Sequence, residues 1–241
     1  MRDIGGLGGT CTLANDLNNQ GQIVGGSTLH GDTQMHPFVW NAATGITDLL
    51  DPSDSSFGFS EAENSHGDIA GQTCDGVTCY AVLWRKRGGH WEKTNLSTIT
   101  QVAVAYSINA SEQVVGDLYA NNIAIAAFLS EDGGPLVDLN TLVPPGSGLQ
   151  IYEVGQVNDR GEISVQGKDA NGNNHVVVLI PCDDQHPGVE GCDYSLVEAS
   201  KTAGVDSTSL SQESMTVNQS NQSFRYTTHS IHPRLGRRLA P

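Results

Sequence analysis

Short apolar segments alternate with clusters of glycine, asparagine, aspartate and proline along most of this chain. The segments are rich in β-branched and aromatic residues, and they do not sustain the 3.6-residue apolar period of an amphipathic helix. Turn-forming residues bound each segment, which is typical of short strands joined by tight turns. The pattern therefore predicts an all-β fold.

An asparagine-led block recurs within this pattern. Each copy begins with Asn, places Gly or Glu three positions later, and runs into an apolar strand. The lead asparagines are 46, 45 and 49 residues apart. A period of this length indicates an array built from one supersecondary unit per repeat. The blocks are residues 18–25, 64–71 and 109–116, with a looser fourth copy at 158–163.

Two further blocks complete each repeat. An aromatic or branched block follows the lead asparagine, as at residues 36–40 and 80–84, and a block such as residues 46–49 closes the unit. With a short apolar opening piece, each repeat holds four strands, which is the size of a propeller blade. We expect a β-propeller-like domain over residues 1–181, with about four blades of four short antiparallel strands. The repeats are placed at about 10–50, 58–97, 103–142 and 150–181.

The lead asparagine and the glycine after it predict a tight turn between the first and second strands. An Asn side chain bonds its own backbone, and Gly adopts a positive φ without steric cost. Glu112 replaces that glycine in the third copy, so we expect a strained or differently shaped turn there. The later Gly25, Gly71 and Gly116 predict close packing or a bulge. The structural turn residues are Asn18, Gly21, Asn64, Gly67, Asn109, Asn158 and Gly161.

These blocks resemble the bacterial extracellular HAF repeat family. Its units run approximately Ile-Asn-x-x-Gly-Gln-Val-Val-Gly, then His-Ala-Phe-Leu-Trp, then Thr-Asp-Leu-Gly. The match covers about residues 3–181, although Pro37, Tyr80 and Ala126 depart from the His-Ala-Phe signature. The resemblance implies a secreted, propeller-like protein. It implies no established activity, so it assigns no catalytic residue.

The two ends of the repeat region suggest how the array is closed. Residues 1–10 resemble the closing block of a repeat, whereas the fourth unit lacks such a block after Ile180. We expect the N-terminal strand, residues 3–7, to pair beside residues 175–180 and close the ring. The alternative is that the sequence begins inside a longer repeat protein.

The five cysteines indicate an oxidising compartment. Cys74 and Cys79 flank a predicted hairpin tip, and Cys182 and Cys192 lie in a Cys-bounded loop over residues 182–198. Both pairs predict small disulfides, with reduced thiols as the alternative. Cys11 is left over, either buried or without its partner. No Cys-x-x-Cys spacing supports a zinc or redox site.

The net charge of −15 argues against nucleic acid or an anionic membrane as partner. No apolar stretch approaches the 18 residues of a membrane span, so we expect no membrane insertion, and a monomer. Residues 199–241 are rich in Ser, Thr, Gln and Asn and predict a disordered tail. A basic anchor for an acidic surface is the alternative for that tail.

The sequence contains no complete catalytic or metal-binding motif. Ser27 and Ser147 fit turns, and His36 and His175 occupy equivalent repeat positions that favour a structural role. Residues 169–174 resemble part of a calcium loop but lack the distal Glu, so a hairpin turn is favoured. Catalytic and ligand-binding residues stay unknown, and we expect neither metal nor cofactor. The tryptophans at equivalent repeat positions, predicted to pack within the blades, are Trp40 and Trp84.

Three function classes follow. The first is a secreted, non-enzymatic binding or interaction module with an unknown ligand, in the extracellular space or the cell envelope. The alternative is an extracellular hydrolase of an ester or polymer, with a site assembled from several blades. A structural part of a larger surface protein is a third possibility.

Overall fold

The computed structural model of the 241-residue chain describes residues 1–51, 53–97, 102–144, 146–189, 192 and, for the backbone, 226–230. These residues form four antiparallel sheets of four strands each, together with a short 3-10 helix, η1 (Leu139–Thr141). The predicted all-β architecture is therefore confirmed.

Within each sheet, strands that are consecutive in the chain are hydrogen-bonded neighbours. The first sheet contains β1 (Gly8–Leu17), β2 (Ile23–Leu29), β3 (Met35–Asn41) and β4 (Gly45–Asp48). The second contains β5 (Phe57–Glu63), β6 (Ile69–Cys74), β7 (Cys79–Arg87) and β8 (His90–Asn95). The third contains β9 (Val102–Ile108), β10 (Gln113–Ala120), β11 (Ile123–Glu131) and β12 (Val137–Asp138). The fourth contains β13 (Leu149–Val157), β14 (Ile163–Asp169), β15 (Asn174–Pro181) and β16 (Tyr226–Ser230).

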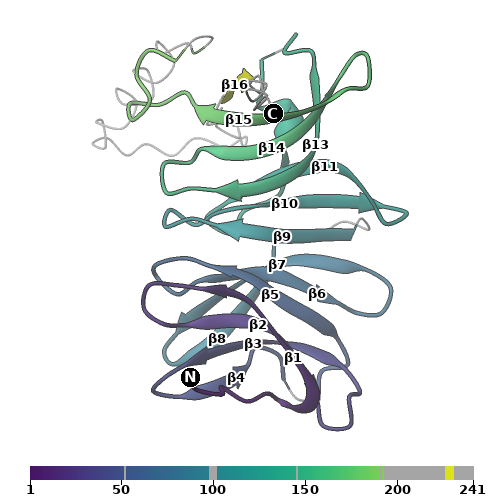
Figure 1. The fold of residues 1–241 in the computed structure, drawn as a ribbon, viewed down its shortest axis with the longest axis vertical. Helices are drawn as coiled ribbons and strands as arrows, with labels where there is room; N and C mark the ends of the chain where they lie inside the picture. The colour runs from purple at the N-terminus through teal and green to yellow at the C-terminus, as the bar shows by residue number, and fades with distance from the viewer. Residues whose placement is uncertain (52, 98–101, 145, 190–191, 193–225, 231–241) are drawn as a thin grey trace, which may run out of the picture.

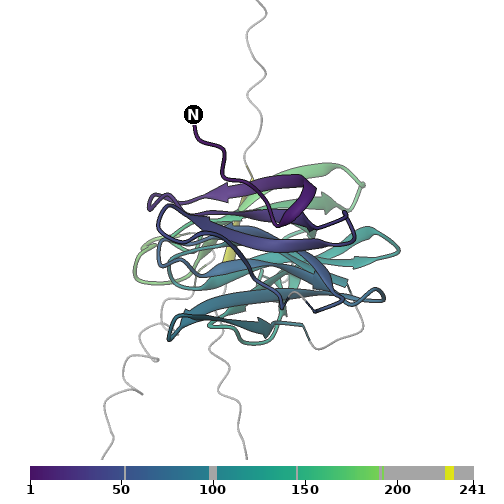
Figure 2. The same cartoon turned by 90° about the horizontal axis from the view of Figure 1, so that it is seen from below.

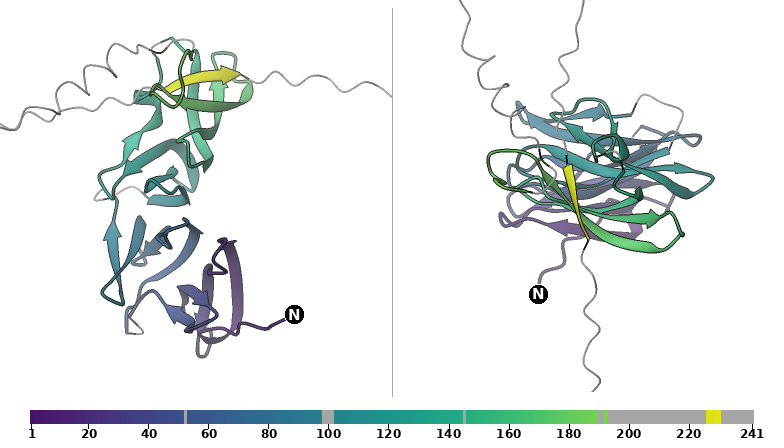
Figure 3. Two further views of the ribbon diagram at one scale, coloured as in Figure 1. Left: turned by 90° about the vertical axis from the view of Figure 1, so that its left-hand side faces the viewer. Right: turned by 90° about the horizontal axis from the view of Figure 1, so that it is seen from above.

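The four sheets follow one another in chain order along an arc (Figures 1 and 3). The first strands of the sheets, β1, β5, β9 and β13, lie toward the concave side of this arc. Three apolar clusters bury the faces between successive sheets. The largest fully buried side chains of the first two junctions are Trp84, Ile69, Leu83 and Phe128. Hydrophobic burial between sheets therefore holds the array together.

The asparagine-led turns have the predicted geometry in all four sheets. In the first, the Asn18 side-chain oxygen accepts the N–H groups of Gln20 and Gln22, and Gly21 has a φ of 77°. Glu112 takes the same left-handed conformation, with a φ of 54°, and its N–H still donates to the Asn109 carbonyl. Of the two alternatives expected for this turn, the different shape is wrong and the strained backbone is the one observed, because the flanking hydrogen bonds hold the glutamate in a conformation that costs a non-glycine residue energy.

The asparagines also connect neighbouring sheets, which the turn argument did not foresee. Asn64 Nδ2 donates to the Asn109 carbonyl at 3.1 Å, and Asn109 Nδ2 donates to the Asn158 carbonyl at 2.9 Å. Asn18 Nδ2 makes the corresponding contact with the Asn64 carbonyl at 3.4 Å. The lead asparagines thus form a ladder of side-chain to main-chain hydrogen bonds across the three sheet junctions.

The predicted close approach at the later glycines is confirmed. A Cβ atom on Gly25, Gly71 or Gly116 would lie 1.9–2.1 Å from a carbonyl oxygen of the adjacent first strand. Each glycine is paired beside a register shift in that strand. The absence of a side chain therefore allows the bulged first strand to curve over the second.

The predicted closure by the N-terminal strand is wrong. Residues 3–7 form no strand, and β1 begins at Gly8 and pairs with β2. The segment instead stays on its own sheet: the Leu7 N–H donates to Ser27 Oγ at 2.9 Å, and the Arg2 guanidinium lies 5.3 Å from the Trp40 ring centroid. Figure 2 shows it running outward from β1. Because residues 3–7 adjoin β1 in the chain, covering this local face costs little loop entropy.

The edge beside β15 is instead paired with β16, from Val177–Ser230 to Pro181–Tyr226. These five residues fall in the segment predicted to be a disordered tail, so that prediction is wrong over them. A partner saturates the free backbone groups of β15, and a Tyr-Thr-Thr sequence suits a strand. The other tail residues, and residues 193–198 of the predicted Cys-bounded loop, lie outside the described part of the chain.

Both predicted disulfides are present, Cys74–Cys79 and Cys182–Cys192. The first joins directly opposed residues of β6 and β7. Cys11 is a free cysteine and is exposed on β1, so it is not the buried thiol that was one of the two expectations. Two disulfides fit a protein of an oxidising compartment.

Candidate functional site

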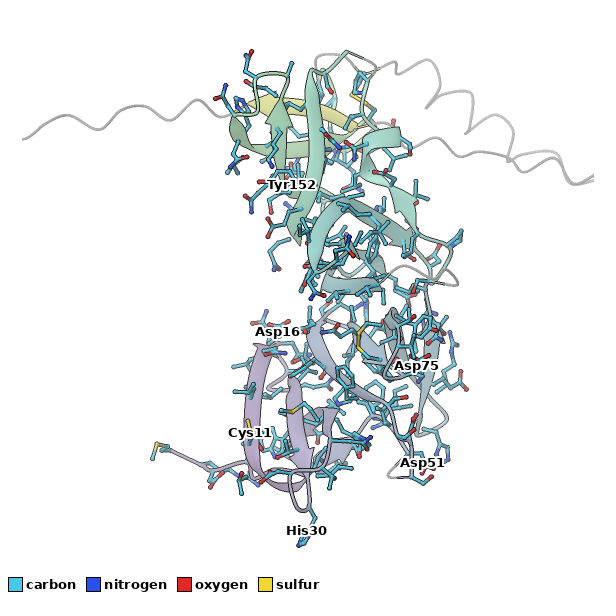
Figure 4. All side chains as sticks on the ribbon, turned by 90° about the vertical axis from the view of Figure 1, so that its right-hand side faces the viewer. Cys11, Asp16, His30, Asp51, Asp75 and Tyr152 are labelled. Carbon is cyan, nitrogen blue, oxygen red and sulfur yellow. A yellow bond between two sulfur atoms is a disulfide. The ribbon has the colours of Figure 1, made fainter. Side chains whose placement is uncertain are left out.

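A polar groove of about 600 Å³ opens on the concave side of the arc. We call it the concave groove. It is built from the first strands of all four sheets together with β10. Figure 4 shows Asp16 of β1 and Tyr152 of β13 on this side of the molecule, with Asp51 and Asp75 on the other side. The lining residues are Ala14, Asn15, Glu61, Tyr106, Asp117, Tyr119, Glu153, Val154, Gly155 and Gln156.

Asp117 is the most deeply placed acid of the concave groove, with 1% of the residue exposed. One carboxylate oxygen accepts the Val154 N–H of the fourth sheet at 2.8 Å. The pKa of Asp117 is raised to about 7, mainly by burial and to a smaller extent by nearby Glu153, whereas the Val154 hydrogen bond opposes the shift. Near neutral pH this carboxyl group can therefore act as either a donor or an acceptor.

Glu61 approaches the groove from β5. Its carboxylate accepts a hydrogen bond from Asn15 Nδ2 at 3.0 Å, and the same amide donates to the Ser60 carbonyl. Burial raises the pKa of Glu61 above its ordinary value. This side chain and Asn15 connect the first and second sheets at the groove floor.

Two tyrosines complete the polar surface. The hydroxyl groups of Tyr106 on β9 and Tyr119 on β10 lie 2.7 Å apart. Burial is the main cause that raises the pKa of both, so both hydroxyls stay protonated at neutral pH. They offer a fixed donor and acceptor next to Asp117.

The charged side chains that line the concave groove all carry the same sign of charge. Three carboxyl groups line it, from Glu61, Asp117 and Glu153, and no Lys, Arg or His side chain of the described part of the chain does. The groove therefore concentrates the negative charge of an acidic chain and favours a cationic group over an anionic one.

The raised carboxyl pKa values predict stability that falls as the pH rises. Burial raises the pKa of Glu63 to about 8, and that of Asp117 to about 7, whereas unfolded carboxyls ionise near pH 4. Between these limits the folded state holds protons that the unfolded state releases, so raising the pH favours unfolding. We expect the melting temperature to be lower at about pH 8.5 than at about pH 5.5, and Glu63→Gln to reduce this difference.

Glu92→Gln is the matched control for this pH dependence, because Glu92 lies exposed on β8. It removes the same formal charge and so measures the effect of net charge alone. Equal pH dependence in the Glu63→Gln and Glu92→Gln variants would show that burial of Glu63 is not the cause.

None of the sequence-predicted turn residues lines the concave groove. His36 is buried and pairs through Nδ1 with Asp48 at 2.8 Å within the first sheet. His175 instead contacts Asp169 at 3.3 Å, so the two equivalent histidines have different partners. Trp40 and Trp84 are buried as expected, with 8% and 0% exposed.

Residues 169–174 form a turn, which agrees with the favoured interpretation. The Asp169 side chain accepts hydrogen bonds from the Asn173 side-chain amide and from the N–H groups of Asn173 and Asn171, and these bonds hold its pKa well below the ordinary value. Within the described residues, no group of three His, Cys, Asp or Glu side chains is placed to hold a metal ion. The same residues include no helix long and apolar enough to cross a membrane.

A second, smaller hollow of about 270 Å³ lies beside the turns of the third and fourth sheets. It is lined by residues such as Ser111 and Gly161, by one basic residue, Arg160, and by four acidic residues, Glu131, Asp132, Asp159 and Asp183. It has less volume than the concave groove, and Arg160 offsets part of its negative charge, so the concave groove is the better candidate site for a cationic group.

The groove residues were missed at the sequence level because most of them lie in the variable first strands, and Asp117 and Tyr119 lie on β10 just after a repeated block. Tyr106 stands in an opening piece, and Asp117 directly follows the repeated Gly116. A polar residue directly after that glycine in an apolar strand is the signal that could have marked it.

Comparisons with protein-family models and with curated proteins find no match to this chain. The resemblance to the HAF repeat family therefore stays a prediction based on its repeated blocks.

Proposed function

We propose that this chain is an extracellular, non-enzymatic binding module of β-propeller type, whose concave groove holds a positively charged group of its ligand. The observation that carries the proposal is the set of three carboxyl groups in a groove that no basic side chain of the described residues lines. Two disulfides support the extracellular assignment. Four similar sheets in an arc support the propeller-like assignment.

Because the pKa of Asp117 is raised, the proposed binding should be accompanied by a measurable release of protons. A cation next to this carboxyl group stabilises its ionised form, so binding near pH 7 releases a proton. The tyrosine pair adds neutral hydrogen-bonding groups that orient a polar ligand.

Titration calorimetry with a lysine tripeptide tests this function, with a glutamate tripeptide as the opposite-charge control. We expect the lysine peptide to bind with proton release, seen as a heat that changes with the ionisation enthalpy of the buffer. Glu61→Gln should weaken binding by about tenfold through loss of one charge-assisted hydrogen bond. Glu92→Gln, which removes an exposed charge on β8, should leave the affinity nearly unchanged. Equal losses in both variants would mean that only the net charge attracts the peptide.

A hydrolase is the second candidate, and one observation favours it. Asp117 and Glu61 come from different sheets, and burial raises the pKa of both, as a general acid requires. A panel of chromogenic esters and glycosides tests this candidate. Turnover that disappears in Asp117→Asn, at unchanged melting temperature, would replace the binding module by the enzyme.

A further inference from the structure

The three internal sheet junctions bury the same position of the first strand. The residue before the lead asparagine is Glu63, Ile108 or Val157 in the second, third and fourth sheets, with 7%, 6% and 7% exposed. Leu17 holds this position in the first sheet and is 62% exposed. The first sheet therefore presents, on β1, a contact surface that the other sheets bury against a preceding sheet.

The face of the fourth sheet that points away from the third sheet also differs in exposure from the equivalent faces of the second and third sheets. At one position on the third strand, Ala81 and Ala127 of the second and third sheets are fully buried against the following sheet. Val176 holds this position in the fourth sheet and is 62% exposed. An apolar side chain thus marks the face on which a following sheet would pack.

The asparagine ladder also ends at the first and the fourth sheet. Asn64 and Asn109 each use one amide hydrogen on their own turn and the other on the carbonyl of the next lead asparagine. Asn158 Nδ2 donates to Glu162, and its second hydrogen has no acceptor within the described residues. At the other end, the Asn18 carbonyl accepts the Gly21 N–H but, among the described residues, no side-chain amide.

We propose that the first sheet of one copy of this chain packs on the fourth sheet of a second copy, in a head-to-tail contact that repeats the internal junctions. Leu17 of one copy then meets the face around Val176 of the other, and Asn158 donates to the Asn18 carbonyl. The occupant is a second copy because each end of the chain presents the groups that the opposite end lacks. Such a contact is heterologous, so it forms a ring if the rotation closes and a chain of copies if it does not.

The N-terminal segment leaves room for this contact. It covers the outer part of the first sheet, where Trp40 is buried and the Leu7 N–H donates to Ser27. Leu17 on β1 stays 62% exposed. The contact therefore uses the inner, concave part of the sheet.

Charge sets the conditions under which the contact forms. Two copies with a net charge of −15 each repel one another at low ionic strength. Association of the full chain should therefore strengthen as the salt concentration rises, as expected for an apolar contact between like-charged molecules.

Sedimentation velocity of the full chain in high salt tests the proposal. We expect concentration-dependent association, weakened by about tenfold or more in both Leu17→Glu and Val176→Glu, since each buries an unpaired charge in the contact. Val77→Glu is the matched control, because Val77 is 91% exposed at the tip between β6 and β7. It should associate like the unchanged chain.

Mixing the two defective variants gives the decisive result. Leu17→Glu keeps an intact fourth sheet and Val176→Glu keeps an intact first sheet, so the mixture should form pairs that neither variant forms alone. A chain that stays monomeric at all concentrations would overturn the proposal. So would association that survives both substitutions, or a mixture that forms no pairs. A fall in melting temperature of Val176→Glu without a change in mass would mean that the chain itself covers this face.

Discussion

Gly71→Ala is expected to destabilise the domain by about 3 kcal/mol or more, among the largest effects of any single methyl group in this chain. The added Cβ would lie 2.1 Å from the Phe59 carbonyl oxygen and 3.0 Å from the Ser60 Cα. Both atoms belong to the backbone of β5, which is paired with β6 and packed on the first sheet. The clash therefore cannot be relieved by turning a side chain. Scanning calorimetry should show a melting temperature lower by roughly 10 °C.

Gly76→Ala separates this steric effect from the loss of glycine itself. Gly76 has a φ of 88° at the hairpin tip, and no heavy atom lies within 4 Å of its Cβ position. The substitution should cost only the strain of a left-handed residue, about 1–2 kcal/mol. If the two variants lose equal stability, close approach of β5 and β6 is not what requires glycine at position 71.

Asn109→Ala is expected to cost about 3–4 kcal/mol. The side chain, in a residue that is 2% exposed, accepts the N–H groups of Ser111 and Gln113 and donates to the Asn158 carbonyl and Gln113 Oε1. Alanine removes all four bonds and leaves buried polar groups without partners, at about 1 kcal/mol each. Chemical denaturation followed by tryptophan fluorescence measures the loss.

Two further variants measure separately how much the turn hydrogen bonds and the ladder hydrogen bonds contribute to stability. Asn158→Ala removes an exposed turn side chain that, among the described residues, makes no bond to a following sheet. The loss of stability should therefore be about half of that caused by Asn109→Ala. Asn109→Asp keeps the oxygen that closes the turn and removes the amide that reaches Asn158. If Asn109→Asp is as stable as the unchanged chain, the ladder contributes nothing to stability.

Much of the architecture could be predicted from the repeated residues. The Asn-to-Gly spacing identified the turns at Asn18, Asn64 and Asn158, because local hydrogen bonds and a positive φ determine that geometry. The spacing of Cys74 and Cys79 around a hairpin tip predicted a disulfide for the same local reason. The strand that pairs with β15 in the fourth sheet was predicted wrongly, since the choice between residues 3–7 and β16 depends on contacts between residues distant in the chain.

The candidate site could be predicted far less well. Glu61, Tyr106 and Asp117 belong to different strands, and nothing in their sequence separation indicates that they line one groove. Their raised pKa values are also a consequence of burial, which exists only after the sheets have packed.

The sequence by itself determined the repeating unit of this protein: four short strands, an asparagine turn, a glycine under a bulge and two short-range disulfides. These features depend on interactions within a sheet or within a short loop, where the residue type at each position decides the backbone conformation. Only the tertiary structure decided how the units meet. The asparagine ladder and the acidic concave groove arise from contacts between sheets, because apolar faces can pack in several ways that the same local pattern permits. The position of the N-terminal segment over Trp40 likewise depends on a tertiary contact.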